Sequence, residues 1–418
     1  MEIKELCKII DENREEIFSL LSDFIKINSE NFGFKGNEEA MARYIYDVCS
    51  ELGLECDTYC PLEIEGFENH PDYFPGRGLE TRYNTVARWK GETDEDELMI
   101  MGHLDTMPIG DIANWTVDPM GGEIKDGKVY GRGACDDKYA LATAVFLIKL
   151  LKRYGFVPKK NLLFAAYCDE ENGGSHGALA AVMKYPCKKV VNMDGRSEIW
   201  NCASGGGEII YRYHTEKAVD SAYLAASAIS VVLETMKGFA ENRREELQRN
   251  KYYDGTIIPD TSLRYNEVCA GKNGTDLGVG FLRFTFYTDK SKEEIYAELD
   301  AIEKILAEKL RPLGIIGDGF SPHTRFFHYQ TCSPEAQIVK EMLAAANEAT
   351  GKQLGICGSC LSDLSVIMKH CGGEAIAYGA GRDFSLEGGA HQRDEFIYCD
   401  DLVNYVKNIG ALILKVLG

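Results

Sequence analysis

The stretch NLLFAAYCDEENGGSHG, residues 161–177, joins a short apolar run to a cluster of acids. Residues 162–168 are apolar and are bounded by polar residues, which is typical of a strand that is buried on both faces of a sheet. Asp169, Glu170 and Glu171 follow directly, with no basic residue beside them. A buried strand thus ends in three carboxylates, and this point is the first candidate for a functional site.

Strands alternate with helices on both sides of this stretch. Apolar runs predict strands at residues 86–91, 97–105 and 189–195. Helical periodicity predicts two amphipathic helices within residues 1–55 and further helices at residues 136–154, 177–185, 334–348 and 400–416. Because strands that alternate with helices form parallel sheets, the sequence predicts an α/β fold with a mostly parallel sheet.

The pattern changes at residues 204–207, a glycine cluster suited to a hinge. Residues 208–330 then read as strand, helix, strand, strand, helix and strand, with the last strand at residues 323–329. This is the order of an α+β domain of the split βαβ, ferredoxin-like type. We therefore expect a catalytic domain formed by residues 1–206 and 331–418, with residues 207–330 inserted as a separate domain.

The bulk composition narrows the class of protein. At 418 residues, 45% of them hydrophobic and 27% charged, the chain is expected to be globular and to form two domains. The net charge of −20 argues against a nucleic acid or an anionic membrane as partner. No apolar run approaches the roughly 18 residues of a membrane span, and the first residues lack the apolar core of a signal peptide. The 14 scattered cysteines are then expected to be reduced thiols in the cytoplasm.

Two pairs of polar residues stand at the ends of predicted elements. His103 and Asp105 lie two residues apart on a strand end, so they point to the same side, and a carboxylate beside a histidine commonly fixes the tautomer of a metal ligand. Asp136 and Asp137 stand just before a helix. Taken alone, the first pair is more simply a chance His-x-Asp at a surface turn, and the second pair is more simply a helix cap.

The constellation is more specific than its parts. Asp194 ends a further buried strand, and His391 lies in the segment GGAHQRDEF, where Glu395 follows it. In a parallel α/β sheet the loops after the strands converge at one edge, so these acids and histidines are expected to meet there. Imidazole and carboxylate groups with few thiolates form a ligand set that suits zinc, cobalt or manganese.

Five segments together resemble a known family of enzymes. They are GHLDT, GRGACDDK, DEENGG, VVNMDG and GGAHQRDEF. In order and spacing they are similar to the co-catalytic zinc metallopeptidases and deacylases, which include acetylornithine deacetylase, succinyl-diaminopimelate desuccinylase, carboxypeptidase G, aminoacylase and carnosinase-like dipeptidases. The resemblance extends to the intervening segment NWTVDPMGGEIKDGKVYGRGA, residues 114–134.

The resemblance implies a site with two divalent metal ions. Zinc is the expected metal, and cobalt and manganese are alternatives. In the family pattern Asp136 bridges the two ions and has an unusual cis peptide next to it. His103 and Asp194 would complete one metal site. Glu171 and His391 would complete the other.

Further roles follow from the same resemblance. Asp105 would orient His103, and Glu170 would be the general base that takes a proton from a metal-bridging water and passes it to the departing amine. The inserted domain would be a lid that often forms a homodimer interface. A family lid usually also donates a histidine that steadies the oxyanion.

The chain departs from the family pattern in this lid. The loop that usually carries the lid histidine is shortened in the segment YRYHTEKAVDSAY, residues 211–223. His214 is a candidate substitute, and a partly exposed strand histidine without a role is an equal alternative. The lid arginine that often binds a substrate carboxylate is also missing, with Tyr287 near its place. Arg382 is a candidate replacement, although a surface salt bridge explains it almost equally well.

We therefore expect a cytoplasmic, dinuclear metal-dependent hydrolase that cleaves a linear amide in a small peptide, of the dipeptidase or carboxypeptidase type. The alternative substrate is an N-acyl amino acid, cleaved by a deacylase of the acetylornithine deacetylase or desuccinylase type. A non-catalytic metal-binding protein on the same fold is a further alternative. An intact Glu170 counts against it, because a binding module has no use for an unligated base. His176, which follows the acids, is expected to be a loop or core histidine.

Overall fold

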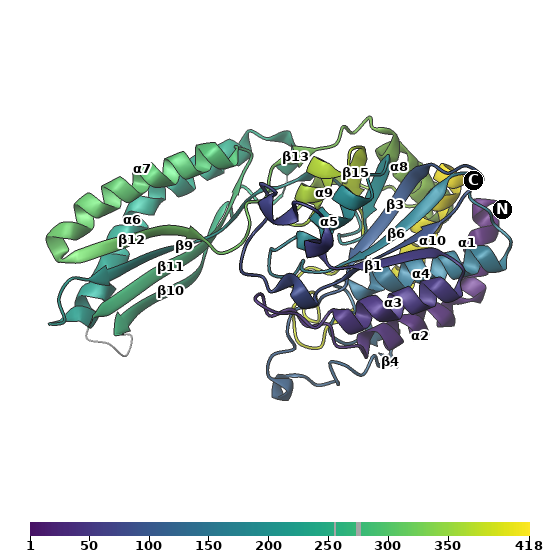
Figure 1. Cartoon of the computed structure of the whole chain (residues 1–418), viewed down its shortest axis with the longest axis horizontal. Coiled ribbons are helices and arrows are strands. Elements are labelled where there is room, and N and C mark those ends of the chain that lie inside the picture. The colour runs from purple at the N-terminus through teal and green to yellow at the C-terminus, as the bar shows by residue number, and fades with distance from the viewer. Residues whose placement is uncertain (255, 273–276) are drawn as a thin grey trace. The chain divides into compact units, whose positions relative to one another are not determined.

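The computed structural model describes residues 1–254, 256–272 and 277–418 (Figure 1). The chain forms two compact units, and each has its own architecture. The first consists of Met1–Asn201, Thr331–Ser359 and Val366–Gly418, and the second consists of Cys202–Gln330 and Cys360–Ser365. The first unit is thus built from both ends of the chain, and the second is almost entirely one continuous segment.

A mixed sheet forms the centre of the first unit. From one edge to the other its strands are β1 (Glu55–Tyr59), β2 (Asn84–Trp89), β6 (Asn161–Tyr167), β3 (Asp96–His103), β7 (Lys189–Asn192), β15 (Glu374–Ala377), β8 (Ile199–Ala203) and β13 (Gln330–Thr331), with β14 (Ile356–Gly358) beside β8. The central strands β6, β3, β7 and β15 are parallel, whereas β2 runs antiparallel to both of its neighbours. The prediction of an α/β fold with a mostly parallel sheet is confirmed.

Helices cover both faces of this sheet. They are α1 (Ile3–Glu12), α2 (Arg14–Ile25), α3 (Glu39–Glu51), α4 (Lys138–Arg153), α5 (His176–Lys184), α8 (Gln337–Thr350), α9 (Leu364–His370) and α10 (Cys399–Leu417). α5 and α9 pack on one face, and the other helices pack on the opposite face. Among the residues described, no helix combines the length and the apolar character needed to cross a membrane.

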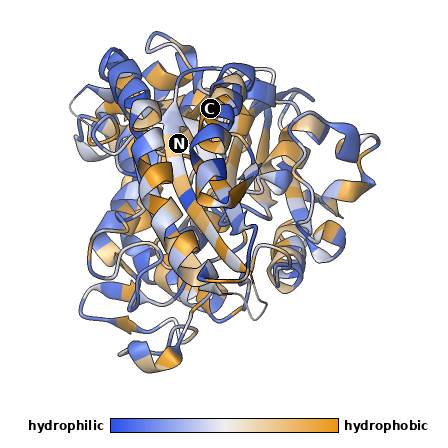
Figure 2. Ribbon diagram, turned by 90° about the vertical axis from the view of Figure 1, so that its left-hand side faces the viewer, coloured by the Kyte–Doolittle hydropathy of each residue, from blue (hydrophilic) through white to orange (hydrophobic). Residues whose placement is uncertain are grey.

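The buried strand β6 shows why this layered arrangement forms. Every residue of β6 is buried. Leu162 and Phe164 belong to the core on the side of α4, whereas Leu163 and Ala165 belong to the core on the side of α5. A strand between two layers of helices needs apolar residues on both faces, which is why its sequence is a continuous apolar run. In Figure 2 orange, hydrophobic residues and blue, hydrophilic residues alternate along the helices.

Residues 1–55 contain three helices rather than the two predicted. α1 and α2 are separated by Asn13, whose backbone leaves the helical region (φ −113°, ψ 16°) and whose amide donates to the carbonyl of Ile9 at 2.8 Å. The apolar spacing continues across this break, and for this reason the periodicity did not show it. α1 packs against α10, so the two ends of the chain lie close together (Figure 1).

A small antiparallel sheet brings two loops of the first unit together. Its strands are β16 (Phe396–Tyr398), β5 (Lys128–Tyr130) and β4 (Ile124–Lys125), in this order. Phe396 of β16 pairs with Tyr130 of β5. Because His391 precedes β16 and Asp136 follows β5, this pairing draws the segments of these two residues toward each other.

The second unit is an antiparallel sheet of order β10-β11-β9-β12 with two helices. Its elements follow the chain as β9 (Gly205–Thr215), α6 (Ser221–Gln248), β10 (Leu263–Lys272), β11 (Gly278–Thr288), α7 (Lys292–Leu310) and β12 (Ile315–Pro322). Both helices pack their buried residues against β9 and β11. The α+β arrangement of the split βαβ type is confirmed.

The structure differs from the predicted second unit in two details. The last strand is β12, not residues 323–329; β12 contains Gly317 and Gly319 and a register shift between them, so it lacks the alternating apolar pattern of a strand. The predicted hinge glycines instead begin β9. Gly206 there has a φ of 131°, and a Cβ atom at this position would clash with the carbonyl oxygen of Phe286. The glycine is needed because backbone approaches backbone closely at this point.

Candidate metal centre

The predicted acids and histidines lie at the carboxyl ends of adjacent parallel strands. His103 is the last residue of β3 and pairs in register with Tyr167 at the end of β6. β7 ends at Asn192, which pairs with Met101 of β3, so that Asp194 follows at the same edge. The loops after parallel strands meet at one edge of a sheet, and the fold thereby brings these side chains together.

Asp136 lies between two histidines. Its Oδ1 is 3.0 Å from Nε2 of His103, and its Oδ2 is 3.2 Å from Nε2 of His391. The peptide bond between Asp136 and Asp137 is cis, as the family resemblance implied. Burial raises the pKa of Asp136, but hydrogen bonds with the two histidines outweigh burial and hold this pKa well below its ordinary value. One carboxylate thus faces a different imidazole with each of its oxygens.

Glu171 contacts the same nitrogen of His391 as Asp136 does. Its Oε2 is 2.8 Å from Nε2 of His391, and its Oε1 accepts the N–H of Met107 at 2.8 Å. Ligand-type atoms of His103, Asp136 and Glu171 all lie within 4.8 Å of one another. Burial lowers the pKa of His391, but the carboxylates of Glu171 and Asp136 raise it to about 12. Imidazole nitrogens and carboxylate oxygens in one place suit a divalent cation.

Asp194 adds a further carboxylate to this cluster. It is half-buried, and burial together with the nearby Asp136 carboxylate raises the pKa of Asp194 to about 7. Its oxygens lie outside the group of three ligand-type residues within 4.8 Å of one another. Crowded carboxylates repel one another, and a bound cation would remove this repulsion. The residues present therefore fit divalent cations.

Asp105 connects His103 to the turn after β6. Its buried carboxylate lies 3.6 Å from Nδ1 of His103, and its backbone carbonyl lies 2.9 Å from the same nitrogen. The N–H groups of Glu170 and Glu171 each donate to this carboxylate at 3.0 Å, and the amide of Asn31 donates to it at 2.7 Å. Burial raises the pKa of Asp105, but the contacts with His103 lower it to about 2. Asp105 thus stays ionised and turns Nε2 of the imidazole toward the other ligand-type atoms.

Glu170 lies next to the ligand-type group. It is half-buried, and its backbone is held by Asp105. Burial lowers the pKa of His103, but Asp105 and Asp136, with a contribution from the charge of Glu170, raise it well above its ordinary value. Among the residues that the structure describes, Glu170 does not belong to a group whose ligand-type atoms all lie within 4.8 Å of one another. Glu170 is therefore near the group without being part of it.

Asp169, the first of the three acids after β6, has a structural environment. Its Oδ1 lies 2.7 Å from Nη2 of Arg77 and 2.6 Å from Nη1 of Arg82. Its Oδ2 lies 2.6 Å from Nδ1 of His176, which is a buried core histidine. Nη1 of Arg82 also lies 2.9 Å from Oε1 of Glu38. This buried network fixes the turn that carries the two following acids.

A second buried ion pair holds the loop of His391. Oε2 of Glu395 lies 2.7 Å from Nη1 of Arg132, and both side chains are buried. Oε1 of Glu395 accepts the N–H of Cys135 at 2.9 Å. Because Cys135 directly precedes Asp136, Glu395 ties the loop of His391 to the segment of the residue between the two histidines.

The two predicted substrate-binding residues make other contacts. Arg382 lies over the ring of Phe396, 4.1 Å from its centroid, and its Nη2 donates to the carbonyl of Glu387 at 3.1 Å. His214 belongs to the second unit, where its Nδ1 lies 2.8 Å from Oδ1 of Asp318. A role in substrate binding stays a prediction for both residues.

Reasoning from the sequence missed the residues that support the site. Asn31 holds Asp105, and Arg77 and Arg82 hold Asp169. Three acids without a basic neighbour at the end of a buried strand imply a distant cationic partner, and these two arginines were the available signal. Nothing in the surrounding sequence distinguishes Asn31.

Comparison with known proteins identifies a family. The family model described as Peptidase family M20/M25/M40 matches residues 99–415. Among curated proteins, an uncharacterized metallohydrolase of Methanocaldococcus jannaschii is 35% identical over 167 residues, which are 39% of this chain and 38% of the relative. A succinyl-diaminopimelate desuccinylase of Bradyrhizobium sp. is 34% identical over 119 residues, 28% of this chain and 30% of the relative. The matches span less than two fifths of the length of these relatives.

The fold is also found among solved structures. A dipeptidase of Saccharomyces cerevisiae aligns with 99% of this chain and 98% of its own, with a TM-score of 0.73 and 15% sequence identity. At this identity the similarity establishes a common fold.

Proposed function

Since this chain belongs to peptidase family M20/M25/M40, we propose that it cleaves an amide bond in a small peptide, as a dipeptidase or carboxypeptidase with two divalent metal ions. Membership of the family makes it a metallohydrolase of the peptidase or amidohydrolase kind. The substrate, the pair of ions and the roles of single residues belong to the proposal.

The position of Asp136 supports the proposal most directly. Each oxygen of its carboxylate faces a different imidazole, at 3.0 Å for His103 and at 3.2 Å for His391. This arrangement suits two cations that share the carboxylate, with Asp194 in the first ligand set and Glu171 in the second. Zinc is the proposed metal, and cobalt and manganese accept the same ligands.

Glu170 is the proposed general base. When bound, the cations would polarise the amide carbonyl and lower the pKa of the attacking water. The charge of Glu170 acts on His103 while Glu170 stays outside the ligand-type group, which supports this role: its carboxylate would take a proton from this water and pass it to the departing amine. Asp105 contacts both the backbone of Glu170 and the ring of His103, and it is the proposed positioning residue for both.

Deacylation of an N-acyl amino acid is the second candidate function. It is supported by the 34% identity with a desuccinylase, in a match that covers 30% of that relative. Both reactions hydrolyse an amide, and both would use the same ligands, so the ligands do not discriminate between them. His214 and Arg382 remain the proposed residues for substrate binding.

Hydrolysis assays with added zinc, cobalt or manganese test the proposal. The panel should hold dipeptides, longer peptides and N-acyl amino acids, and the control is the Asp136→Ala variant. We expect metal-dependent cleavage of peptides by the wild type and none by the variant. Cleavage of N-acyl amino acids alone would favour the second candidate. Metal binding without any hydrolysis would leave a non-catalytic metal-binding protein on the same fold.

We also propose a homodimer formed through the second unit. Val219, Tyr223 and Ile316 of this unit expose 76%, 73% and 43% of their surface, and exposed apolar side chains are common at protein interfaces. Light scattering should then give twice the monomer mass of 46.6 kDa. A strict monomer would contradict the dimer. Any residue that the second unit supplies to the catalytic site would then come from the same chain. The cytoplasmic location stays a prediction.

A further inference from the structure

Two thiols, those of Cys49 and Cys56, meet where α3 is joined to β1. Cys49 lies in the last turn of α3, and Cys56 is the second residue of β1. Between them Gly53 adopts a left-handed conformation (φ 74°), and the N–H of Leu54 donates to the carbonyl of Cys49 at 3.1 Å. This turn folds the strand back along the helix, so that the two thiols lie close enough to interact, and the Sγ of Cys56 donates to the carbonyl of Leu54 at 3.7 Å.

The two thiols differ in their access to solvent. Cys49 is fully buried, whereas Cys56 is partly exposed. Cys56 lines a surface cavity of about 510 Å³, together with residues of α3 and β1 that include Arg43 and Thr58. A small molecule that enters this cavity can therefore reach the sulfur of Cys56 but not that of Cys49.

The pKa values of the two thiols also differ, and the more accessible thiol has the lower pKa. The hydrogen bond with Cys49 lowers the pKa of Cys56 to about 7. The same contact and burial raise the pKa of Cys49 well above its ordinary value. The thiolate is the nucleophile in thiol chemistry, and here it forms on the accessible partner.

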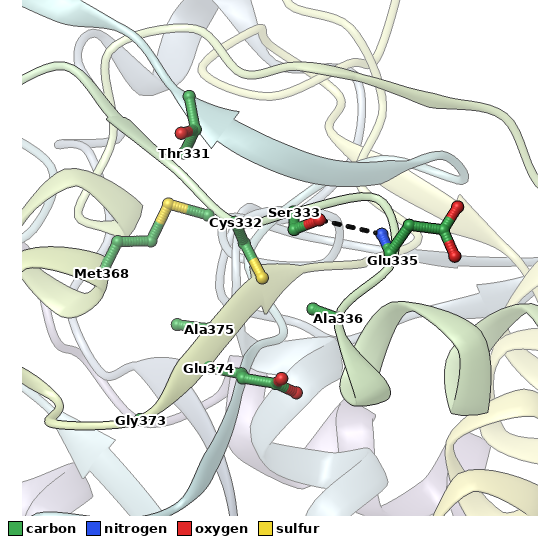
Figure 3. Close-up of a pocket in the computed structure, with 9 residues that line it drawn as sticks. All are labelled: Thr331, Cys332, Ser333, Glu335, Ala336, Met368, Gly373, Glu374 and Ala375. Carbon is green, nitrogen blue, oxygen red and sulfur yellow. Dashed lines mark hydrogen bonds between the residues drawn. The ribbon is translucent and has the colours of Figure 1, made fainter.

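Cys332 shows that a cavity alone does not create such a site. It lines a cavity of about 350 Å³ between the start of α8 and β15 (Figure 3). Burial and the nearby carboxylate of Glu374 raise the pKa of Cys332 to about 11. Glu374 stays at this place because it accepts the N–H groups of Gln337 and Ile338, at 3.2 and 2.9 Å. Cys332 is thus a control for Cys56 within the same chain.

We propose that Cys56 is a modification site for small disulfides and that Cys49 converts the mixed disulfide into an intramolecular one. The surface cavity admits the reagent, the partly exposed sulfur of Cys56 receives it, and the buried sulfur of Cys49 is the adjacent second thiol. An accessible thiol of low pKa beside a second cysteine is the usual composition of a redox-responsive site.

The chemistry consists of two thiol–disulfide exchanges. The Cys56 thiolate attacks one sulfur of a disulfide RSSR, so that a Cys56–SR bond forms and RS⁻ leaves with the electron pair and takes a proton from water. The Cys49 thiol then attacks the Cys56 sulfur, the Cys49–Cys56 bond forms, and the second RS group leaves as RSH with the proton of Cys49. Two protein thiols are oxidised, and the small disulfide is reduced to two thiols.

Oxidised glutathione is the probe for the test. The full chain is incubated with it at about pH 7, the remaining thiols are alkylated, and peptides are identified by mass spectrometry. The wild type should yield a Cys49–Cys56 disulfide that a thiol reductant reverses. Cys49→Ser should retain one glutathione on Cys56, because the second exchange cannot occur. Cys56→Ser should acquire no glutathione on Cys49, because that sulfur is buried.

Relative reactivity within the wild type tests the proposal without any variant. A greater thiolate fraction and a lower intrinsic nucleophilicity together predict that Cys56 reacts about threefold faster at pH 7 than an ordinary exposed thiol. Timed alkylation compares Cys56 with the exposed Cys269 and with Cys332. Reaction of Cys56 no faster than Cys332 would overturn the site. A glutathione adduct on wild-type Cys56 that never gives way to the intramolecular disulfide would overturn the role of Cys49.

Discussion

The backbone N–H of Glu170 donates to both carboxylate oxygens of Asp105, at 3.2 and 3.0 Å. Asp105 also lies 3.6 Å from Nδ1 of His103. A single buried acid therefore sets the direction of a proposed metal ligand and the position of the proposed general base.

Replacing Asp105 by asparagine should disturb both neighbours. The amide keeps the size of the side chain but loses its charge and one acceptor, so it holds the imidazole and the turn less firmly. We expect metal affinity or turnover to fall about 10- to 100-fold, which is typical for partners of metal ligands. Metal titration and rates should be measured on the same sample. Asp111→Asn, at an exposed acid that caps a short helix, is the control and should leave both quantities unchanged.

Glu170 and Glu171 should differ in what their removal damages. Glu170→Gln keeps the ligand set, so both ions should stay bound while turnover falls by about 10²- to 10⁴-fold, the usual value of general acid–base catalysis. Glu171→Gln changes a proposed ligand, so one ion should bind far more weakly. Metal content and rate on the two purified variants check this. Full activity of Glu170→Gln, or equal loss of metal in both variants, would contradict the division of roles.

Metal content should reveal two ions that share Asp136. His103→Ala and His391→Ala should each weaken one ion, because each imidazole lies at a different oxygen of this carboxylate. Asp136→Ala should weaken both. Stoichiometry after dialysis, measured by elemental analysis, distinguishes the three variants. His323→Ala, a substitution in the second unit outside both groups of ligand-type residues, serves as the control. Zero metal in the wild type after incubation with zinc, cobalt and manganese would contradict the assignment of these residues as metal ligands.

Removing Arg82 should destabilise the first unit. Its buried guanidinium lies 2.9 Å from Glu38 and 2.6 Å from Asp169. Arg82→Leu leaves both buried carboxylates without this partner, and breaking a buried ion pair costs about 3–5 kcal/mol. Thermal unfolding followed by circular dichroism should show a clearly lower midpoint. Lys26→Leu, which removes an exposed pair with Asp23, should barely change the midpoint. Equal effects of the two substitutions would contradict the structural role of the network.

The ionisation of Asp169 should make the free energy of unfolding depend on pH. Burial raises its pKa, but the hydrogen bond with His176 and the charges of Arg77 and Arg82 outweigh burial and lower it. An acid whose pKa is lower in the folded state stabilises the fold above its unfolded pKa, about 3.9 for Asp, and loses this contribution as pH falls through the folded pKa. The free energy of unfolding should therefore fall more steeply below about pH 5 in the wild type than in Asp169→Asn. Identical pH slopes would contradict this.

Local patterns in the sequence were sufficient for most elements and for the candidate ligands. The apolar run at 162–168 became the strand β6, Asn161–Tyr167, because a strand covered on both faces has to be apolar throughout. The residues after β3, β6 and β7 could be expected to meet because parallel strands deliver their ends to one edge. Both arguments rest on short-range periodicity and on chain direction, which the sequence displays directly.

Only the tertiary structure shows which side chains hold each of the three acids after β6. Asp169 is tied to Arg82 and His176, whereas the next two acids are held by Asp105, and no local feature distinguishes the three carboxylates. In the same way, the sequence did not reveal the strand β12, because its register is set by pairing with β9 across a bulge. A buried charge requires a partner, but the order of residues along the chain does not say which distant side chain packing will bring to it.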